Sequence, residues 1–255
     1  MKKEQIQYFA GIIDSEGSFS MRVFQKGNSI NLTGFKLEIC DRDVLAPLAD
    51  YFDLDINSQD RGANRKLIYN IRLGNKTGLI PFIELFLPYL NEKRVQAQLI
   101  LDYFQLKRED KISKRFEFMD AFSGEKKSPS TTNVEFSLPY LAGIMDGDGY
   151  FNVVNSGHSG MNISIGLEQC YPYLAEYLQN KFGGSVSKRY PANYNHRERT
   201  TWTYSELEGT NKLIKEFAPY IIIKTQNIKN CEKLYKVKSA YLNFVKQMKA
   251  IRDYE

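Results

Sequence analysis

Four acidic residues stand in two short, closely similar segments, where their types and spacing suit metal chemistry. One segment reads Asp14-Ser-Glu-Gly17 and the other reads Asp146-Gly-Asp-Gly149. Each follows an apolar stretch with helical spacing, and the C-terminus of a helix carries partial negative charge that disfavours acids. Breaking this local rule at two equivalent places indicates a functional site. Ordinary helix-stop and turn chemistry could explain one such segment, but it explains two of them poorly.

Small residues precede both acid segments, as Ala10-Gly11 and Ala142-Gly143. Because Gly and Ala let two helix backbones approach closely, we expect the two helices to pack together and to join Glu16 with Asp148. Carboxylates held close together repel each other unless a cation lies between them. Mg²⁺ binds one or two carboxylates together with water and phosphate oxygens. The pattern therefore predicts metal-assisted hydrolysis of a phosphodiester.

The acid segments belong to a longer internal repeat, which indicates a duplicated domain. At offsets of 130 to 132 residues, Phe9–Gly17 recurs as Leu141–Gly149, Leu37–Cys40 as Leu167–Cys170, and Pro88-Tyr89 with Lys93 as Pro219-Tyr220 with Lys224. We predict an α+β protein with a first repeat over 1–107, a linker over 108–137 and a second repeat over 138–255. The linker is assigned from its Lys, Glu, Ser and Pro content.

Apolar spacing and turn residues predict the same element order in both repeats. For the first repeat we expect a helix over 3–13 closed by Gly17, strands over 18–26 and 31–39 with a bulge at Gly34, a helix over 44–52 capped by Asp43, strands over 55–59 and 66–73, and helices over 78–87 and 91–107. For the second we expect a helix before Asp146, strands over 150–154, 162–167, 185–190 and 199–206, and helices over 172–182, from 210 and from 224. A short helix over 114–122 is possible in the linker, and a final helix from Tyr241 has no counterpart.

The composition sets broad limits on the class of protein. A net charge of +5 over 255 residues favours an anionic partner without selecting nucleic acid, lipid or protein. The three cysteines Cys40, Cys170 and Cys231 lack metal-ligand spacing and predict reduced thiols rather than disulfides or a zinc site. No membrane-length apolar run or leader is visible, so we expect a reducing intracellular location, in an organelle matrix or a prokaryotic cytoplasm. No Ser-His-Asp order, phosphate loop or dinucleotide fingerprint occurs.

Both nonapeptides resemble the LAGLIDADG motif, and the α-β-β-α-β-β-α order resembles the repeat of LAGLIDADG homing endonucleases. The resemblance covers nearly the whole chain except the linker and the C-terminal tail. It implies a monomer with two pseudo-symmetric repeats, whose antiparallel sheets form a saddle over double-stranded DNA. It also implies a mobile-intron nuclease that cuts a long asymmetric site across the minor groove and leaves short 3′ overhangs.

The resemblance assigns roles to residues that match the motifs. It implies metal ligation by the last acids, Glu16 and Asp148, and by the backbone carbonyls of Ser15 and Gly147. It implies that Lys93 and Lys224 join the solvent network at the scissile phosphates. A structural role is implied for the remaining motif residues, Ala10, Gly11, Asp14, Gly17, Ala142, Gly143, Asp146 and Gly149. The implied cofactor is Mg²⁺, with Mn²⁺ as a substitute and Ca²⁺ binding without cleavage.

Two departures from the motif stand in the first repeat. Phe9 replaces the usual Leu, a change that an apolar core accepts. Glu16 replaces the commoner Asp, and its extra methylene group predicts unequal metal sites and faster cutting of one strand.

Polar strand faces in both repeats suit a DNA groove, because Arg and Asn pair with purine edges and Lys suits phosphates. In the first repeat these residues are Arg22, Lys26, Asn31, Thr33, Lys36, Arg61, Arg65, Lys66, Asn70 and Arg72. In the second they are Asn152, Asn162, Ser164, Ser187, Arg189, His196, Arg197, Arg199, Thr201 and Thr203. A solvated strand face explains any single one of them equally well, so only the set supports DNA binding.

Two alternative functions remain open at this stage. A maturase would use the same fold to bind the RNA of its own intron. A DNA-binding regulator would use it without cleavage. Acids and lysines in both repeats argue against the regulator, but they leave the maturase open because one protein can perform both activities.

Overall fold

The structure is a computed structural model of the chain, in which residues 1–23, 30–62, 65–74, 76–127, 136–155, 161–170, 172–189 and 198–252 are described. The chain forms two compact units, Met1–Gly147 and Asp148–Glu255. The boundary falls just after the second motif helix, because that helix packs against the first motif helix and so belongs to the first unit.

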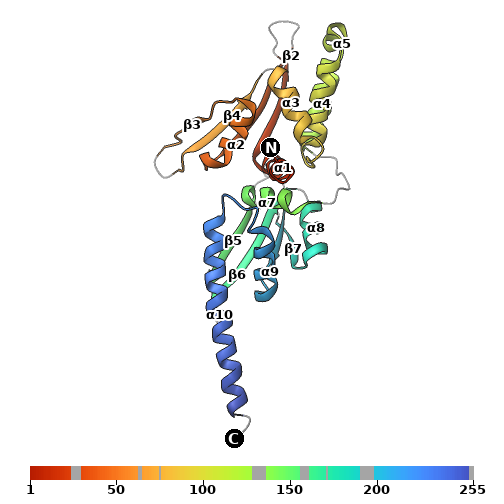
Figure 1. The fold of residues 1–255 in the computed structure, drawn as a ribbon. Helices are drawn as coiled ribbons and strands as arrows, with labels where there is room; N and C mark the ends of the chain where they lie inside the picture. The colour runs from red at the N-terminus through yellow and green to blue at the C-terminus, as the bar shows by residue number, and fades with distance from the viewer. Residues whose placement is uncertain are drawn as a thin grey trace. The chain divides into compact units, whose positions relative to one another are not determined.

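The first unit contains one four-stranded antiparallel sheet with the strand order β1-β2-β4-β3 (Figure 1). Its elements are α1 (Lys3–Glu16), β1 (Gly17–Val23), β2 (Ile30–Ile39), α2 (Arg42–Phe52), β3 (Asn57–Gln59), β4 (Ile68–Leu73), α3 (Lys76–Phe86), α4 (Arg94–Gln105), α5 (Arg108–Ser113), α6 (Arg115–Lys127) and α7 (Leu138–Gly147).

The second unit contains a sheet of the same kind, with the order β5-β6-β8-β7. Its elements are β5 (Gly149–Asn155), β6 (Met161–Gln169), α8 (Pro172–Phe182), β7 (Ser185–Arg189), β8 (Arg199–Tyr204), α9 (Leu207–Phe217) and α10 (Thr225–Arg252). The predicted α+β class, the antiparallel sheets and the repeated element order are therefore confirmed.

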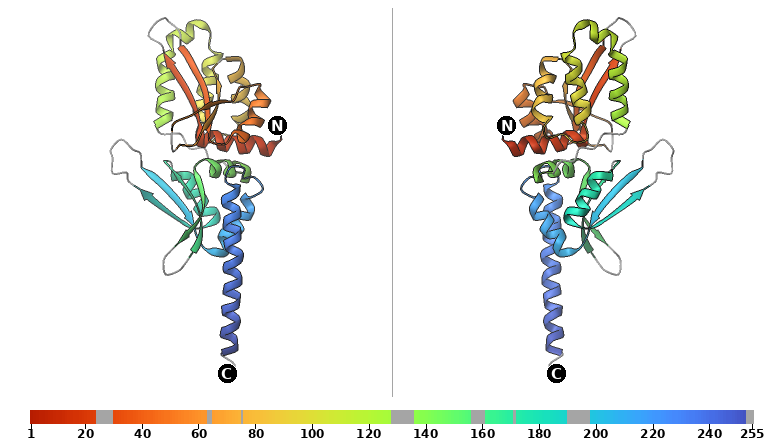
Figure 2. Two further views of the ribbon diagram at one scale, coloured as in Figure 1. Left: turned by 90° about the vertical axis from the view of Figure 1, so that its left-hand side faces the viewer. Right: turned by 90° about the vertical axis from the view of Figure 1, so that its right-hand side faces the viewer.

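Each sheet buries one face beneath helices and leaves the other polar, because successive strand residues point to opposite faces. In the first unit Phe35 is buried, and its ring centroid lies 4.5 Å from that of Phe82 on α3. In the second unit Trp202 is fully buried and donates a hydrogen bond from Nε1 to the carbonyl of Gly183 at 2.8 Å. Figure 2 shows α8, α9 and α10 on one side of the second sheet.

Two local predictions for the first repeat had different outcomes. The bulge at Gly34 is confirmed, because the β1–β2 register shifts beside it and its φ is +89°. A Cβ at Gly34 would also lie 1.6 Å from the carbonyl oxygen of Leu73, so only glycine fits. The predicted helix cap at Asp43 is wrong. Asp41 is the N-cap of α2, and its carboxylate accepts a hydrogen bond from the Asp43 N–H at 3.0 Å.

The linker and the C-terminal segment hold more helix than the sequence analysis predicted. The helix expected over 114–122 is present and longer, as α6, and α5 precedes it. The separate helix expected from Tyr241 is wrong, because α10 runs unbroken over 28 residues without any Gly or Pro to interrupt it. None of the described helices is long and apolar enough to cross a membrane.

Candidate metal and nucleic-acid site

The motif helices α1 and α7 pack directly against each other within the first unit. A Cβ at Gly11 would lie 2.2 Å from the carbonyl oxygen of Tyr140, and one at Gly143 would lie 2.1 Å from that of Tyr8. Both distances are far below van der Waals contact, so the two backbones meet only because glycine stands at both positions. The close approach expected from the Ala-Gly pairs is present in the structure.

The first acid of the first motif is buried and serves as an anchor between elements. Asp14 is 1% exposed, and its carboxylate accepts hydrogen bonds from the N–H groups of Asn91 at 2.7 Å and Lys93 at 2.9 Å. It also accepts one from the Tyr140 hydroxyl at 2.8 Å. Burial raises the pKa of the Asp14 carboxyl, although Lys93 and these hydrogen bonds act in the opposite direction. Asp14 therefore ties α1 to the start of α4 and to α7.

The first acid of the second motif has a matching tyrosine partner. Asp146 is 3% exposed, and the Tyr8 hydroxyl donates a hydrogen bond to its carboxylate at 2.8 Å. Burial, and then the nearby Asp146 charge, raise the pKa of Tyr8, which therefore stays protonated as a donor. The tyrosine of each motif helix thus bonds the aspartate of the other. The sequence analysis missed Tyr8 and Tyr140, although both immediately precede the repeated nonapeptide.

The last acid of each motif is exposed to solvent, unlike the first. These exposed acids are Glu16 and Asp148. A Cβ at Gly147 would lie 2.1 Å from Ser15 Oγ and 3.3 Å from Glu16 Cγ. The two residues whose carbonyls are predicted metal ligands, Ser15 and Gly147, therefore lie side by side at the ends of α1 and α7.

This donor set fits a hard divalent cation held through few protein atoms. An exposed carboxylate beside the negative end of a helix attracts cations. Mg²⁺ keeps most of its water and binds substrate phosphates, so it does not need a closed protein cage. The described residues contain no group of three or more His, Cys, Asp and Glu side chains that could form such a cage.

A lysine lies beside the end of each motif. The Lys93 ammonium donates a hydrogen bond to the backbone carbonyl of Asp14, and the Lys224 ammonium donates one to the carbonyl of Gly149. Both lysines follow a tight turn after their Pro-Tyr pair, just before α4 and α10. The structure therefore brings each lysine to its own motif, although they are 79 and 75 residues away in sequence.

Gln169, at the end of β6, is a candidate site residue that the sequence analysis missed. Its Nε2 donates a hydrogen bond to Asp148 Oδ2 at 3.3 Å, and the residue is 6% exposed. Its buried Oε1 has no hydrogen-bond partner among the described residues. The internal repeat contained a signal for this residue. Leu37-Glu-Ile-Cys40 of the first repeat corresponds to Leu167-Glu-Gln-Cys170 of the second, so a polar Gln169 replaces the apolar Ile39 at the equivalent position.

The exposed face of the first sheet carries cations around one acid. Glu38 pairs with Lys36 at 2.7 Å and with Arg61 at 3.3 Å. Arg72 is exposed and donates from Nε to Asn70 Oδ1 at 3.0 Å. Asn70 itself is 2% exposed, so it orients Arg72 rather than presenting its own side chain at the surface.

The second sheet carries an aromatic ring on its polar face. A Cβ at Gly166 would lie 2.3 Å from Cζ of Tyr150, so the tyrosine ring lies across the glycine. The Tyr150 hydroxyl and Thr203 Oγ1 are hydrogen-bonded at 3.1 Å. Glu168 repeats the role of Glu38, because it pairs with Arg199 at 2.6 Å.

The other predicted DNA contacts fall into three groups. Arg65, Lys66, Asn152, Ser187 and Arg189 are exposed, and Thr201 is half-buried. Ser164 is buried, and Asn162 accepts a hydrogen bond from Lys238 of α10 at 2.5 Å. Lys26, His196 and Arg197 lie outside the described residues, as do the side chains of Arg22, Asn31 and Thr33.

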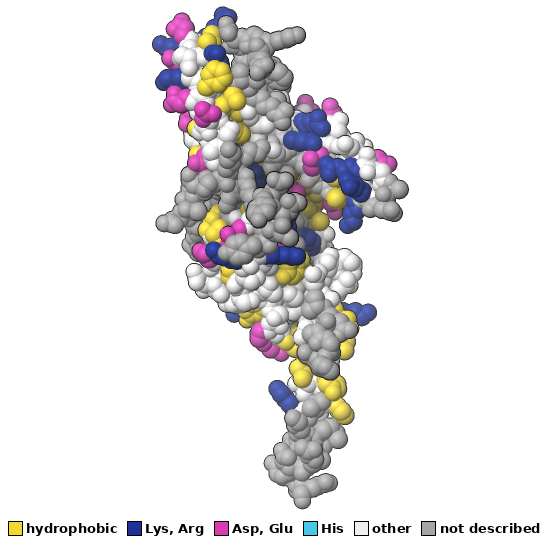
Figure 3. All heavy atoms as spheres, turned by 180° about the vertical axis from the view of Figure 1, so that it is seen from behind, with side chains coloured by type: hydrophobic (Ala, Val, Ile, Leu, Met, Phe, Trp, Pro, Cys, Tyr) yellow, Lys and Arg dark blue, Asp and Glu magenta, His cyan; other side chains and the backbone are white. Residues whose placement is uncertain are grey.

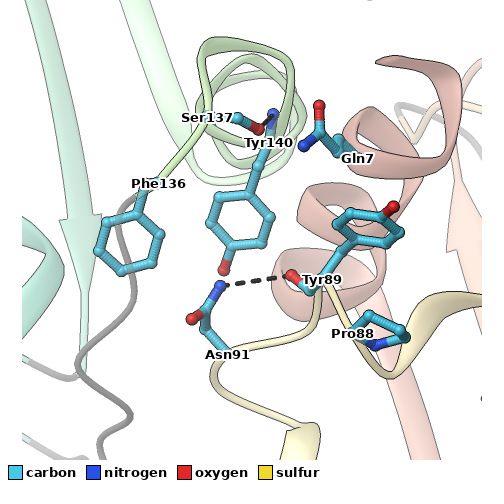
Figure 4. Close-up of a pocket in the computed structure, with 7 residues that line it drawn as sticks. All are labelled: Gln7, Pro88, Tyr89, Asn91, Phe136, Ser137 and Tyr140. Carbon is cyan, nitrogen blue, oxygen red and sulfur yellow. Dashed lines mark hydrogen bonds between the residues drawn. The ribbon is translucent and has the colours of Figure 1, made fainter. Parts of the chain in front are cut away.

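A small pocket opens beside Tyr140 (Figure 4). Its cavity measures about 50 Å³, which holds only a few water molecules. Gln7, Pro88, Tyr89, Asn91, Phe136 and Ser137 complete its lining. This cavity is too small for a nucleotide, so we do not include it in the candidate DNA-binding surface, which consists of the open, polar sheet faces.

The sequence profile of the LAGLIDADG endonuclease family matches residues 141–245, which include the second motif, the second sheet and most of α10. The match therefore covers the second repeat and shows its similarity to the LAGLIDADG endonuclease family. The duplicated nonapeptide at Phe9–Gly17 relates the first repeat to the same domain.

Solved structures of LAGLIDADG nucleases share the fold of both repeats. I-SmaMI, bound to an uncleaved DNA target with calcium ions, is 18% identical at a TM-score of 0.73, covering 96% of this chain and 97% of that chain. The meganuclease I-AabMI, bound to uncleaved DNA, is 18% identical at 0.71, covering 92% of each. I-GzeII, in complex with its DNA target, is 18% identical at 0.69, covering 92% and 91%. The chain as a whole therefore has the LAGLIDADG meganuclease fold.

Proposed function

We propose that this chain is a site-specific homing endonuclease that hydrolyses both strands of a long, asymmetric DNA target with divalent metal. The observation that carries the proposal is the contrast within each motif. Asp14 and Asp146 are buried and hydrogen-bonded, whereas Glu16 and Asp148 are exposed at the helix ends. A purely structural motif gives no reason to keep two acids exposed at sites that disfavour negative charge. The LAGLIDADG domain and the DNA-bound relatives support the same conclusion.

Glu16 and Asp148, with the carbonyls of Ser15 and Gly147, would hold the metal. Bound Mg²⁺ stabilises the charge that develops on the attacking and leaving oxygens of a phosphodiester. We expect Mn²⁺ to substitute for it and Ca²⁺ to bind without cleavage. I-SmaMI bound to an uncleaved target in the presence of calcium is consistent with the last expectation.

Lys93 and Lys224 would place a positive charge beside each motif. Each ammonium is fixed by a backbone carbonyl at the motif end. An ammonium has three donor protons, so it can also bind a phosphate oxygen or ordered water. A positioned cation of this kind stabilises the negative charge of the transition state.

We propose that the repeats over 1–107 and 138–255 each contact one half of the DNA target. Their exposed sheet faces supply the cations, amides and hydroxyls that read base edges and hold phosphates. We expect cleavage to leave short 3′ overhangs. One chain would supply both halves of the nuclease.

Cleavage selection from a randomised double-stranded DNA library in Mg²⁺ tests the function. The wild-type chain is compared with the double variant Glu16→Gln, Asp148→Asn. Glu109→Gln with Asp110→Asn is a matched control, because it removes two acids from α5, far in sequence from either motif. We expect wild type and control to enrich one long site with 3′ overhangs, and the double variant to bind that site without cutting it.

Other outcomes would replace the proposal with a different function. If no protein cuts but all select one DNA sequence, the chain is a DNA-binding regulator. If none cuts or selects DNA, intron RNA becomes the substrate to test, and tight binding that survives Glu16→Gln would identify a maturase.

A further inference from the structure

Two cations stand directly opposite each other on the polar face of the first sheet. Lys36 of β2 and Arg72 of β4 are partners in the antiparallel register. Such a pair of like charges destabilises a sheet unless the charges are compensated. Lys36 pairs with Glu38 at 2.7 Å, whereas Arg72 forms no salt bridge with the residues that the structure describes. Figure 3 shows Lys and Arg side chains gathered over the part of the first unit that contains β3 and β4.

A neutral amide, and not an acid, holds the arginine in place. Arg72 Nε donates a hydrogen bond to Asn70 Oδ1 at 3.0 Å, and the two residues share one face because they are two positions apart on β4. Asn70 is 2% exposed, and its Nδ2 donates a hydrogen bond to the backbone carbonyl of Asn57 on β3 at 3.4 Å. That carbonyl fixes the direction of the amide, so the amide oxygen points to the arginine. The guanidinium group is therefore oriented without losing its charge.

The bond to Asn70 leaves most of the guanidinium donors available. A guanidinium group has five N–H donors in one plane, and Nε carries only one of them. Arg72 is exposed, and its terminal nitrogens donate to no other group in the described part of the chain. Two adjacent donors in a fixed plane match the O6 and N7 acceptors of guanine in the major groove of DNA. Arginine to guanine is also the commonest specific base contact.

The place of β4 in the sheet favours a base edge over a phosphate as the partner of Arg72. β4 is an inner strand, with β2 on one side and β3 on the other. A two-stranded ribbon fits the major groove, so side chains near its middle face the base edges and those near its borders face the phosphates. A phosphate can be bound by a cation that turns freely, whereas a bidentate pair with a base needs a plane held in one direction.

The second repeat lacks both members of this pair. Thr203 of β8 stands at the position of Arg72, and its Oγ1 is hydrogen-bonded to the Tyr150 hydroxyl at 3.1 Å. Thr201 stands at the position of Asn70, and its hydroxyl donates to Glu168 at 3.4 Å. The second sheet therefore has no oriented cation at this place, and we expect the two halves of the DNA target to differ there.

We propose that Arg72 is a specificity-determining residue that pairs with a guanine in the half of the target contacted by the first repeat, and that Asn70 is the positioning residue that aligns it. This inference rests on the proposed function, because it requires a DNA target. It extends that function by assigning one base and the two residues that select it. A bidentate arginine–guanine pair discriminates against the other bases by about tenfold or more.

Binding selection of the full chain on a randomised double-stranded DNA library in Ca²⁺ tests the pairing, since it records base preference without cleavage. We expect wild type to select guanine at one base pair that depends on Arg72. Arg72→Lys keeps the charge but not the planar pair of donors, so this preference should fall by about tenfold or more while preferences at other base pairs persist. Arg108→Lys is the matched control, because Arg108 is an exposed arginine of α5, outside the sheet, and it should select like wild type.

Two variants of Asn70 test the alignment separately. Asn70→Ala removes the acceptor of the Arg72 Nε hydrogen bond and should lower the guanine preference severalfold although the cation remains. Asn70→Asp keeps an acceptor oxygen at the same place and should retain the preference. A purely structural role for Asn70 would instead weaken binding to all sequences alike, without changing the preference at one base pair.

An unchanged guanine preference in Arg72→Lys would overturn the proposal, as would a wild-type site without any guanine that depends on Arg72. Equal weakening of binding to every sequence in Arg72→Lys would place the arginine at a phosphate and would also overturn it. Because Arg72 is exposed, this comparison does not depend on whether the Asn70 variants fold. All of these outcomes leave the endonuclease assignment standing, provided that wild type selects one DNA site. A wild-type chain that selects no DNA sequence would remove the proposed function, and this inference with it.

Discussion

The two sheets present different chemistry at identical positions beside their motif acids. One cross-strand row in the first sheet is Ser18, Lys36 and Arg72, and the equivalent row in the second is Tyr150, Gly166 and Thr203. The first row carries two cations. The second is neutral, with the tyrosine ring across the glycine and its hydroxyl bonded to Thr203.

The two repeats have kept the same buried contacts since the duplication, but their exposed sheet faces have diverged. Both repeats keep the buried first acid, its tyrosine partner, the glycine contact and the motif lysine. These features depend on close packing, which tolerates little substitution. The exposed face has no such constraint, so its side chains diverged. We infer that the two repeats share one chemistry and contact the two halves of the target by different means.

The largest expected effect tests whether the two motifs share one chemistry. Glu16→Gln and Asp148→Asn, made singly, should each slow cleavage by at least about 1,000-fold, because each removes a metal-binding carboxylate. Single-turnover cleavage of the selected site in Mg²⁺ measures the rate, and DNA binding in Ca²⁺ shows that the fold is retained. A single variant that cuts both strands at the wild-type rate would remove that acid from the site.

The next effect concerns the symmetric packing of α1 and α7. Gly11→Ala and Gly143→Ala should each lower the free energy of unfolding by about 3 kcal/mol, because the new methyl group meets a backbone carbonyl. Gly124→Ala is the control. It lies within α6 with nothing within 4 Å of a new Cβ, and it should stabilise the chain by about 0.5 kcal/mol. Urea unfolding measures all three, and a large inequality between Gly11 and Gly143 would break the symmetry.

The salt dependence of DNA binding should separate the two sheet faces. The plot of the logarithm of the DNA-binding constant against the logarithm of the salt concentration has a negative slope. Lys36→Ala with Arg72→Ala should make that slope shallower by about 1 to 2, since each cation that contacts a phosphate contributes about 0.9 to its magnitude. Tyr150→Phe with Thr203→Val should leave the slope unchanged while altering base preference. Fluorescence anisotropy over a range of KCl concentrations measures both, and equal slopes would show that neither row meets phosphates.

The smallest effect concerns the two strands. Gln169 contacts Asp148, whereas the equivalent position in the first repeat is Ile39, which has no hydrogen-bonding side chain, and Glu16 is one methylene longer than Asp148. We expect wild type to nick one strand faster, and Gln169→Ile to slow one strand by about tenfold through loss of a hydrogen bond to a charged group. Strand-labelled supercoiled plasmid measures both rates. Equal nicking rates in wild type would contradict the expected asymmetry.

Much of the fold could be predicted because its signals are local. Apolar alternation gave the strands, apolar spacing gave the helices, and two copies of one nonapeptide gave the duplication. Errors arose where two local signals competed. Asp41 and Asp43 are both able to cap a helix, and only the backbone at residue 41 has the extended conformation of an N-cap. Gly17 closes α1 as expected, but its backbone is extended, with a φ of −73°, and glycine is needed there because a Cβ would lie 2.6 Å from the carbonyl of Ile13.

The candidate site was harder to predict from the sequence than the fold, because the type of a residue does not show which other residues surround it. Asn70 looked like a DNA contact but is buried beneath Arg72, and Asn162 is bonded to Lys238. Gln169 was overlooked because its partner Asp148 is 21 residues away in sequence. In each case the deciding contact comes from another strand or helix.

The sequence by itself determined the periodic elements, the duplication and the residue types at both motif ends, because these follow from spacing along the chain. Only the tertiary structure decided which acid of each motif is buried and which is exposed, and which tyrosine bonds which aspartate. These properties depend on distances between residues far apart in sequence, and such distances exist only once the chain has packed.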